Sequence, residues 1–156
     1  MSKVGKIKGG GQGMNIFCKM GDGFERFKGP LTDFSMLALR VAFGLGLLMN
    51  HGWPKLMNFF AMAPSFPDPL HLGSPTISFG LVVFAEFFCS LFVILGVFTR
   101  WACIPVLIMM NTAFFVFHAQ DPFAKKELAF LYGIGFLTIF LIGGGKFSLG
   151  RLFCRR

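Results

Sequence analysis

Four stretches of the chain are apolar almost throughout and are separated by segments that contain Pro, Gly or charged residues. They predict helices at about residues 34–53, 76–97, 102–120 and 127–143. A helix needs about 20 mostly apolar residues to cross a bilayer, whereas a helix of a soluble bundle would show one apolar stripe and a polar face. These stretches are apolar on all sides. The pattern therefore predicts an all-α, antiparallel transmembrane four-helix bundle.

The ends of these helices carry their own signals. Ser74-Pro75 predicts the start of the second helix, because Pro fits the first helical position. Asp121-Pro122 ends the third helix, and Gly143 begins the glycine run that ends the fourth. The short connections after the second and third helices predict antiparallel neighbours. Gly44 and Gly46 in the first helix predict close approach of another helix.

Composition separates the chain into three parts. Residues 1–30 are basic and Gly-rich with little apolar content, and they lack the continuous apolar core of a secretory signal. We predict a flexible cytoplasmic tail there. Residues 31–152 form the predicted membrane domain, and residues 153–156 form a basic C-terminal end.

The net charge of +8 is unevenly distributed. Basic residues gather before the first helix, at Arg100 between the second and third, and after the fourth, while the other two loops hold few. The positive-inside rule then places both termini and the Arg100 turn in the cytoplasm. This distribution indicates contact with anionic lipid rather than with nucleic acid.

Two charged residues lie within the predicted spans. Glu86 is near the middle of the second helix and Arg40 is about two turns into the first. A charge at the bilayer centre costs roughly 2.5–3.5 kcal/mol on insertion scales, so it usually has a partner or a function. We therefore expect Arg40 to be the buried charge partner of Glu86.

Further polar residues gather at the predicted outer end. His51 and Lys55 end the first helix, His118 lies near the end of the third and Glu127 begins the fourth, with Glu86 beneath them. These side chains could bind a small anion, or hydrogen-bond a quinone headgroup and relay protons. No metal site is predicted, because no HExxH spacing or comparable ligand pattern is present.

The cysteines bear on thiol chemistry. The sequence has four, at Cys18, Cys89, Cys103 and Cys154, without a CxxC pair. The predicted topology places none of them for an external disulfide. Thiol-exchange mechanisms are therefore disfavoured.

These residues together resemble the DoxX family of small four-helix integral membrane proteins. The resemblance covers residues 31–152. The matching pieces are Arg40, His51-Gly52-Trp53-Pro54-Lys55-Leu56, Gly73-Ser74-Pro75, Glu86, Leu95-Gly96-Val97-Phe98-Thr99-Arg100, His118, Glu127-Leu128-Ala129 and Gly143-Gly144-Gly145-Lys146-Phe147-Ser148. Each piece is short, and it is their order and spacing that make the match specific.

The resemblance implies a function class. Some DoxX-like proteins resemble subunits of a thiosulfate:quinone oxidoreductase, and others support a membrane-associated oxidoreductase complex. We therefore expect a redox-associated subunit of the bacterial inner membrane, with a protein partner or a second copy of itself. It has no cofactor motif of its own, so we expect catalysis only within a quinone-linked complex, with quinone or a small sulfur anion at the polar cluster. A non-catalytic scaffold or assembly subunit, and a small-solute or proton transporter, remain as alternatives.

Overall fold

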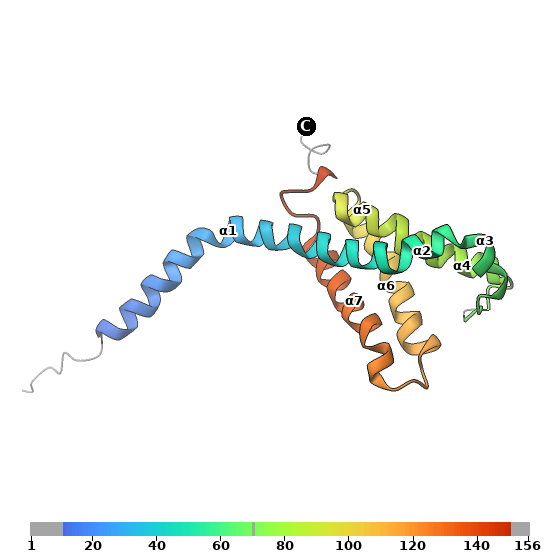
Figure 1. Cartoon of the computed structure of the whole chain (residues 1–156). Coiled ribbons are helices and arrows are strands. Elements are labelled where there is room, and N and C mark those ends of the chain that lie inside the picture. The colour runs from blue at the N-terminus through green and yellow to red at the C-terminus, as the bar shows by residue number, and fades with distance from the viewer. Residues whose placement is uncertain (1–10, 70, 151–156) are drawn as a thin grey trace, which may run out of the picture.

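The computed structural model of the chain describes residues 11–69 and 71–150, with the backbone alone for residues 11–28. All regular secondary structure in this part of the chain is helical, and it contains no strand (Figure 1). Its elements are α1 (Gly11–Leu47), the π-helix η1 (Leu48–Gly52), α2 (Trp53–Met57), α3 (Phe59–Met62), the 3-10 helix η2 (Ala63–Ser65), α4 (Pro75–Val83), the π-helix η3 (Phe84–Cys89), α5 (Ser90–Leu95), α6 (Thr99–Thr112), the π-helix η4 (Ala113–Phe117) and α7 (Phe123–Ile142).

The π segments join neighbouring α-helices into longer rods. Three of these, Gly29–Met57, Pro75–Leu95 and Thr99–Phe117, are long and apolar enough to cross a membrane. The all-helical class is thus confirmed, with three candidate membrane-spanning helices. At 20 residues α7 is also long enough, but its first two turns contain the charged residues Lys125, Lys126 and Glu127. A fourth span, and the side of the membrane on which each terminus lies, stay predictions.

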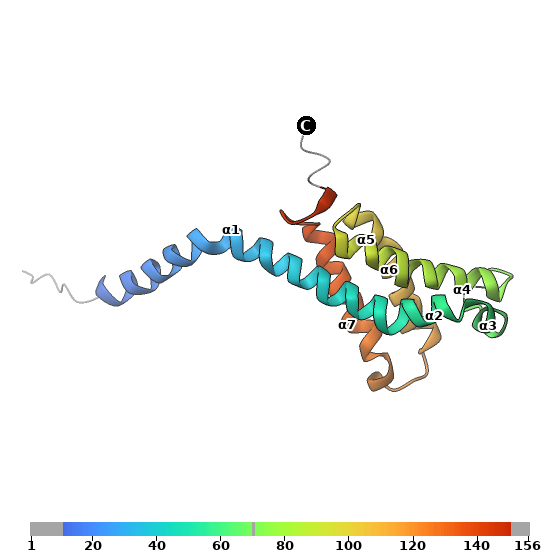
Figure 2. The same cartoon turned by 45° about the horizontal axis from the view of Figure 1, so that its top comes forward.

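The structure differs from the prediction at the N-terminal side. We expected a flexible tail over residues 1–30, but α1 extends back to Gly11, while residues 1–10 lie outside the described residues. No proline interrupts the stretch before Pro30, and Pro30 itself is accommodated inside α1. A proline removes one helical hydrogen bond and favours a kink. Figures 1 and 2 show α1 changing direction and its N-terminal part projecting away from the other helices.

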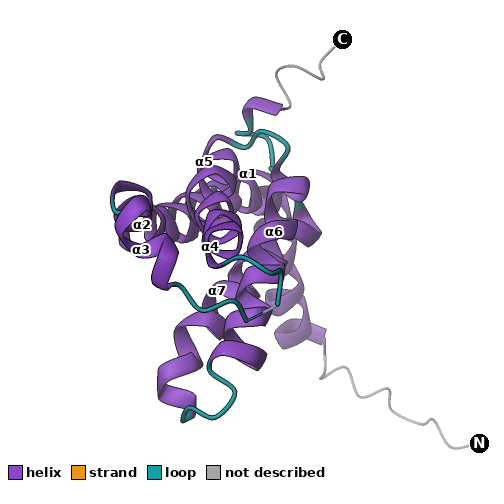
Figure 3. Ribbon diagram, turned by 90° about the vertical axis from the view of Figure 1, so that its right-hand side faces the viewer, coloured by secondary structure: helices purple, strands orange, loops and turns teal. Residues whose placement is uncertain are grey.

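Small residues allow the helices to pack closely, as predicted for Gly44. A Cβ atom at Gly44 would lie 2.5 Å from Ile94 Cγ1 and 3.3 Å from the Ser90 carbonyl oxygen of α5. At Gly135 of α7 a Cβ atom would overlap the ring of Phe43. The largest buried cluster contains Met36, Leu47, Ala85, Cys89, Val93, Ala102, Cys103, Val106, Met110, Phe136 and Ile139. It joins α1, η3, α5, α6 and α7 into one body, viewed in Figure 3.

Large apolar side chains cover much of the outside of this body. Phe34, Phe60, Phe115 and Leu141 are each more than 60% exposed. In water such a surface would be strongly unfavourable, whereas hydrocarbon chains solvate it. The helices therefore present an apolar surface suited to contact with the lipid bilayer.

The prediction that Arg40 pairs with Glu86 is wrong. Arg40 is fully buried, and its Nη2 donates a hydrogen bond to the Phe147 carbonyl oxygen at 3.0 Å. It lies against Gly96, where a Cβ atom would overlap its Nη1. Gly96 follows Glu86 by ten residues, about 15 Å along a helix. Close packing of α1 on α5 therefore places Arg40 beside Gly96, too far along the helix to pair with Glu86.

Candidate functional site

The three π-helical segments coincide with the residues singled out by the sequence. His51 lies in η1, Glu86 lies in η3, and His118 follows η4 directly. A π segment inserts one residue into an α-helix and is frequently found at functional sites. The helices that form the site thus depart from α-helical geometry at or next to the residues that carry those side chains.

Gly52 sets the distance between η1 and η3. A Cβ atom at this position would lie 2.6 Å from the Glu86 carbonyl oxygen and 2.9 Å from Phe87 Cα. Those atoms belong to backbone and cannot rotate away. Only glycine therefore allows the two segments to approach this closely, and Lys55, one turn further along, is brought within reach of the Glu86 side chain.

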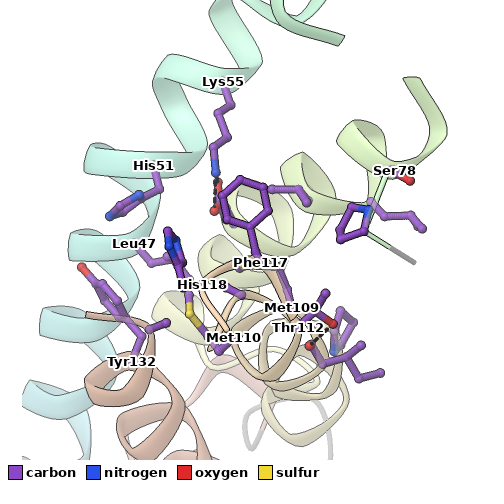
Figure 4. A pocket seen from close by; sticks show the side chains of 18 of the residues that line it. Leu47, His51, Lys55, Ser78, Met109, Met110, Thr112, Phe117, His118 and Tyr132 are labelled. Carbon is purple, nitrogen blue, oxygen red and sulfur yellow. Dashed lines mark hydrogen bonds and ion pairs between the residues drawn. The ribbon is translucent and has the colours of Figure 1, made fainter. Parts of the chain in front are cut away.

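Lys55 and Glu86 form a buried ion pair. Lys55 Nζ lies 2.5 Å from Glu86 Oε1 and 2.6 Å from Oε2 (Figure 4). The Glu86 side chain is 5% exposed and that of Lys55 is 23% exposed. A carboxylate in an apolar interior needs such a partner. Lys55 takes the role that we expected of Arg40.

A cavity of about 620 Å³ opens beside this ion pair. His51, Lys55, Glu86 and His118 all line it, so the structure brings together four of the five predicted site residues. Figure 4 labels His51, Lys55 and His118 among them. Glu127 is exposed and does not line the cavity. The remaining lining residues are mostly apolar: Leu47, Phe66, Pro69, Leu72, Ser78, Leu81, Val82, Phe84, Pro105, Ile108, Met109, Met110, Thr112, Ala113, Phe117, Lys125, Leu128, Ala129 and Tyr132.

Tyr132 is a cavity residue that the sequence analysis missed. It lies on α7, and its ring packs edge-on against His51 with centroids 6.0 Å apart. Its hydroxyl lies near the Asn50 side chain. The sequence did contain a signal, because this is the only tyrosine of the chain and it lies within an apolar helix. Such a hydroxyl usually has a polar neighbour when buried.

His118 has a carboxylate partner in the loop after η4. Its Nδ1 lies 2.7 Å from Asp121 Oδ2, and Lys125 Nζ lies 3.3 Å from Asp121 Oδ1. The hydrogen bond with His118, and then that with Lys125, hold the pKa of the Asp121 carboxyl below its ordinary value. Asp121 is therefore an ionised acceptor at neutral pH. The sequence analysis treated this residue only as a helix-ending signal.

Asp68 organises the loop at the mouth of the cavity. Its carboxylate accepts a 2.5 Å hydrogen bond from the Ser78 hydroxyl, and others from the Leu72 and Gly73 amides at 3.0 and 2.9 Å. These bonds, the Ser78 bond foremost, lower the pKa of Asp68. Ser78 and Leu72 both line the cavity, so Asp68 holds part of its wall.

The lowered pKa of Asp68 has a predicted consequence for the loop. A depressed folded-state pKa gives stability that is present above the ordinary value of 3.8 and is lost as the pH falls through the folded value. Hydrogen exchange, corrected for intrinsic rates, should show the Leu72 and Gly73 amides protected at pH 6 and losing protection below about pH 3.8. Asp68→Asn should weaken that protection already at pH 6. Unchanged protection in both cases would contradict this role.

The remaining candidate chemistry is limited within the described part of the chain. No three His, Cys, Asp or Glu residues there are grouped as a metal site would require. Cys89 and Cys103 are buried free thiols. Arg100, placed by the sequence in a turn, donates a hydrogen bond to the Leu141 carbonyl oxygen at 3.2 Å and does not line the cavity.

The fold and this site define a class, that of all-helical integral membrane proteins with a polar cluster inside an apolar cavity. The chain belongs to the DoxX family, whose family model matches residues 35–119. That match contains Arg40, His51, Lys55, Glu86 and His118, and it confirms the predicted family. The glycine run after α7 and Glu127 lie outside the matched residues. No curated protein and no solved structure matches the chain.

Proposed function

We propose that this protein is the membrane subunit of a redox-associated complex and binds the headgroup of a quinone in the cavity beside Lys55 and Glu86. The observation that carries the proposal is the cavity itself. It measures about 620 Å³, within the range of small-molecule sites, and its mostly apolar wall with a few convergent polar groups is typical of such sites. His51 and His118 supply hydrogen-bonding groups that suit the oxygens of a quinone.

The electrostatics favour a quinone over a small sulfur anion. Lys55 is the most buried cationic side chain of the cavity, and both oxygens of Glu86 already neutralise it. An entering anion would have to compete with a carboxylate at 2.5 Å and leave water for an apolar surface. A quinone headgroup is neutral, so it neither competes with the Glu86 carboxylate for Lys55 nor loses the hydration of a charge. One ammonium proton of Lys55 is left over for a ligand carbonyl.

The alternative function is a non-catalytic scaffold or assembly subunit. That function requires the charges to be paired with one another and needs no cavity. Pairing of Lys55 with Glu86 agrees with it, but the adjoining cavity has no part in it. Quinone binding accounts for both features and is therefore preferred.

The proposal also concerns the membrane around the protein and its partner subunit. We infer that α7 is a fourth span, that both termini face the cytoplasm and that the membrane is a bacterial inner membrane, following the distribution of basic residues. Electron transfer would need the quinone and a partner subunit, because the sequence has no redox cofactor motif. The partner is thus expected to carry the electron donor.

The test is native purification in mild detergent with mass spectrometry of bound quinone and co-purifying polypeptides. The wild-type protein should retain the quinone or its quinol form, and His118→Leu should lower the quinol affinity about three- to tenfold, the effect of one lost hydrogen bond. Ile134→Ala on the outward face of α7 is the control and should retain it, since Ile134 is exposed and outside the cavity. A stoichiometric protein partner without quinone, unaffected by either change, would establish the scaffold function instead.

A further inference from the structure

We propose that Asp121 is a positioning residue that fixes the tautomer of His118, so that Nε2 of His118 is the atom presented to the ligand. The ligand part of this inference rests on the proposed quinone site. The tautomer part rests on the geometry alone. It concerns a loop residue that the sequence analysis did not assign to the site.

The geometry determines which ring nitrogen carries the proton. His118 Nδ1 and Asp121 Oδ2 are 2.7 Å apart, a short hydrogen bond typical of charged partners. An ionised carboxylate can only accept, so Nδ1 must be the donor. In the neutral imidazole the second nitrogen, Nε2, then has no proton and can only accept. His118 lines the cavity, and Nε2 is the nitrogen left for it.

The other histidine of the cavity is held differently. His51 packs edge-on against Tyr132, and Figure 4 shows both histidines among the side chains that line the cavity. Asp121 is also held in place from its other side by Lys125. The Asp121 side chain is 34% exposed. It therefore contacts solvent as well as the His118 ring, which lines the cavity.

This arrangement selects among ligand forms. The neutral His118 ring accepts a hydrogen bond from a hydroxyl, as a quinol offers, whereas the protonated ring donates one to a carbonyl, as a quinone offers. The charged and titratable groups nearest His118 in the chain are Asp121, Lys125 and Lys126, and the cavity wall adds His51, Lys55, Glu86 and Tyr132.

The tautomer can be measured on the full-length protein without any ligand. Nitrogen-15 NMR of histidine-labelled protein, with His118→Gln identifying the signal, should show His118 protonated at Nδ1 at a pH where the ring is neutral. Asp121→Asn should shift it toward the Nε2-protonated form, because an amide can donate to Nδ1. Lys126→Gln, which removes a nearby charge that hydrogen-bonds the Ala119 carbonyl and lies over the Phe114 ring, should leave the tautomer unchanged. An Nε2-protonated wild type, or no shift in Asp121→Asn, would overturn the proposal.

Ligand binding then separates this inference from the proposed function. Binding of a short-chain quinol should weaken about three- to tenfold in Asp121→Asn, and Asp121→Glu, which keeps a carboxylate, should recover part of it. If the tautomer follows Asp121 but neither quinone nor quinol binds, the proposed function fails and the positioning role stands. If quinol binds and Asp121→Asn leaves both tautomer and affinity unchanged, the positioning role fails and the proposed function stands.

Discussion

Replacement of Lys55 with Met is expected to lower the free energy of unfolding by about 3–5 kcal/mol, because it leaves a buried carboxylate without its partner. The Glu86 side chain is 5% exposed and both of its oxygens contact Lys55 Nζ. Glu86→Gln should cost less, since the Lys55 side chain is 23% exposed and its ammonium can turn toward water. Reversible unfolding by SDS titration in mixed micelles measures both changes.

The double variant Lys55→Met with Glu86→Gln should recover much of the loss, because no unpaired charge remains. Lys125→Met is the matched control: this lysine also pairs with a carboxylate, that of Asp121, but its side chain is 66% exposed. An exposed pair contributes about 0–1 kcal/mol, so this control should stay close to wild type. If Lys55→Met and Lys125→Met lost equally little, the Lys55–Glu86 pair would not stabilise the protein.

Replacement of Gly52 with Ala is expected to lower the free energy of unfolding by about 1–3 kcal/mol, as overpacking in a close-packed interior does. The added Cβ atom would lie 2.6 Å from the Glu86 carbonyl oxygen and 2.7 Å from its carbonyl carbon, so η1 and η3 must separate. Separation also moves Lys55 away from the Glu86 carboxylate. Quinone affinity should therefore fall together with stability in the same detergent assays.

Gly133→Ala provides the control for a helical glycine without a close neighbour. The nearest atom to its added Cβ is Met110 Cβ at 3.9 Å, an ordinary contact. This change should be neutral or stabilise by up to about 1 kcal/mol, because Ala is the better helix former. Equal behaviour of the two glycine variants would show that the approach of η1 to η3 does not depend on Gly52.

Much of the fold could be predicted from local sequence. Long apolar stretches predicted the helices and their membrane character, because hydrocarbon leaves the backbone no partners except its own. Ser74-Pro75 and Asp121-Pro122 predicted where helices begin and end, and α4 does begin at Pro75. The N-terminal boundary of α1 was not predictable in this way, since basic and glycine residues over 1–28 weakly favour several conformations.

The sequence predicted most residues of the candidate site but not which of their side chains pair with one another. Topology alone put His51, Lys55, Glu86 and His118 at related depths, and all four line the cavity. Glu127 was misplaced because a depth estimate does not say which face of a helix a side chain occupies. Tyr132 was missed because its role comes from His51 on another helix, whereas Asp121 was missed because it was interpreted only as a helix-ending signal, although His118 lies three residues before it.

The sequence by itself thus determined the class of protein, the helices and the family, because hydropathy and residue order act locally. Only the tertiary structure decided that Lys55 rather than Arg40 neutralises Glu86. The reason is the close contact of backbones at Gly52 and at Gly96, which sets the rotation and offset of each helix. Partners of buried charges depend on these two quantities, and no single stretch of sequence contains them.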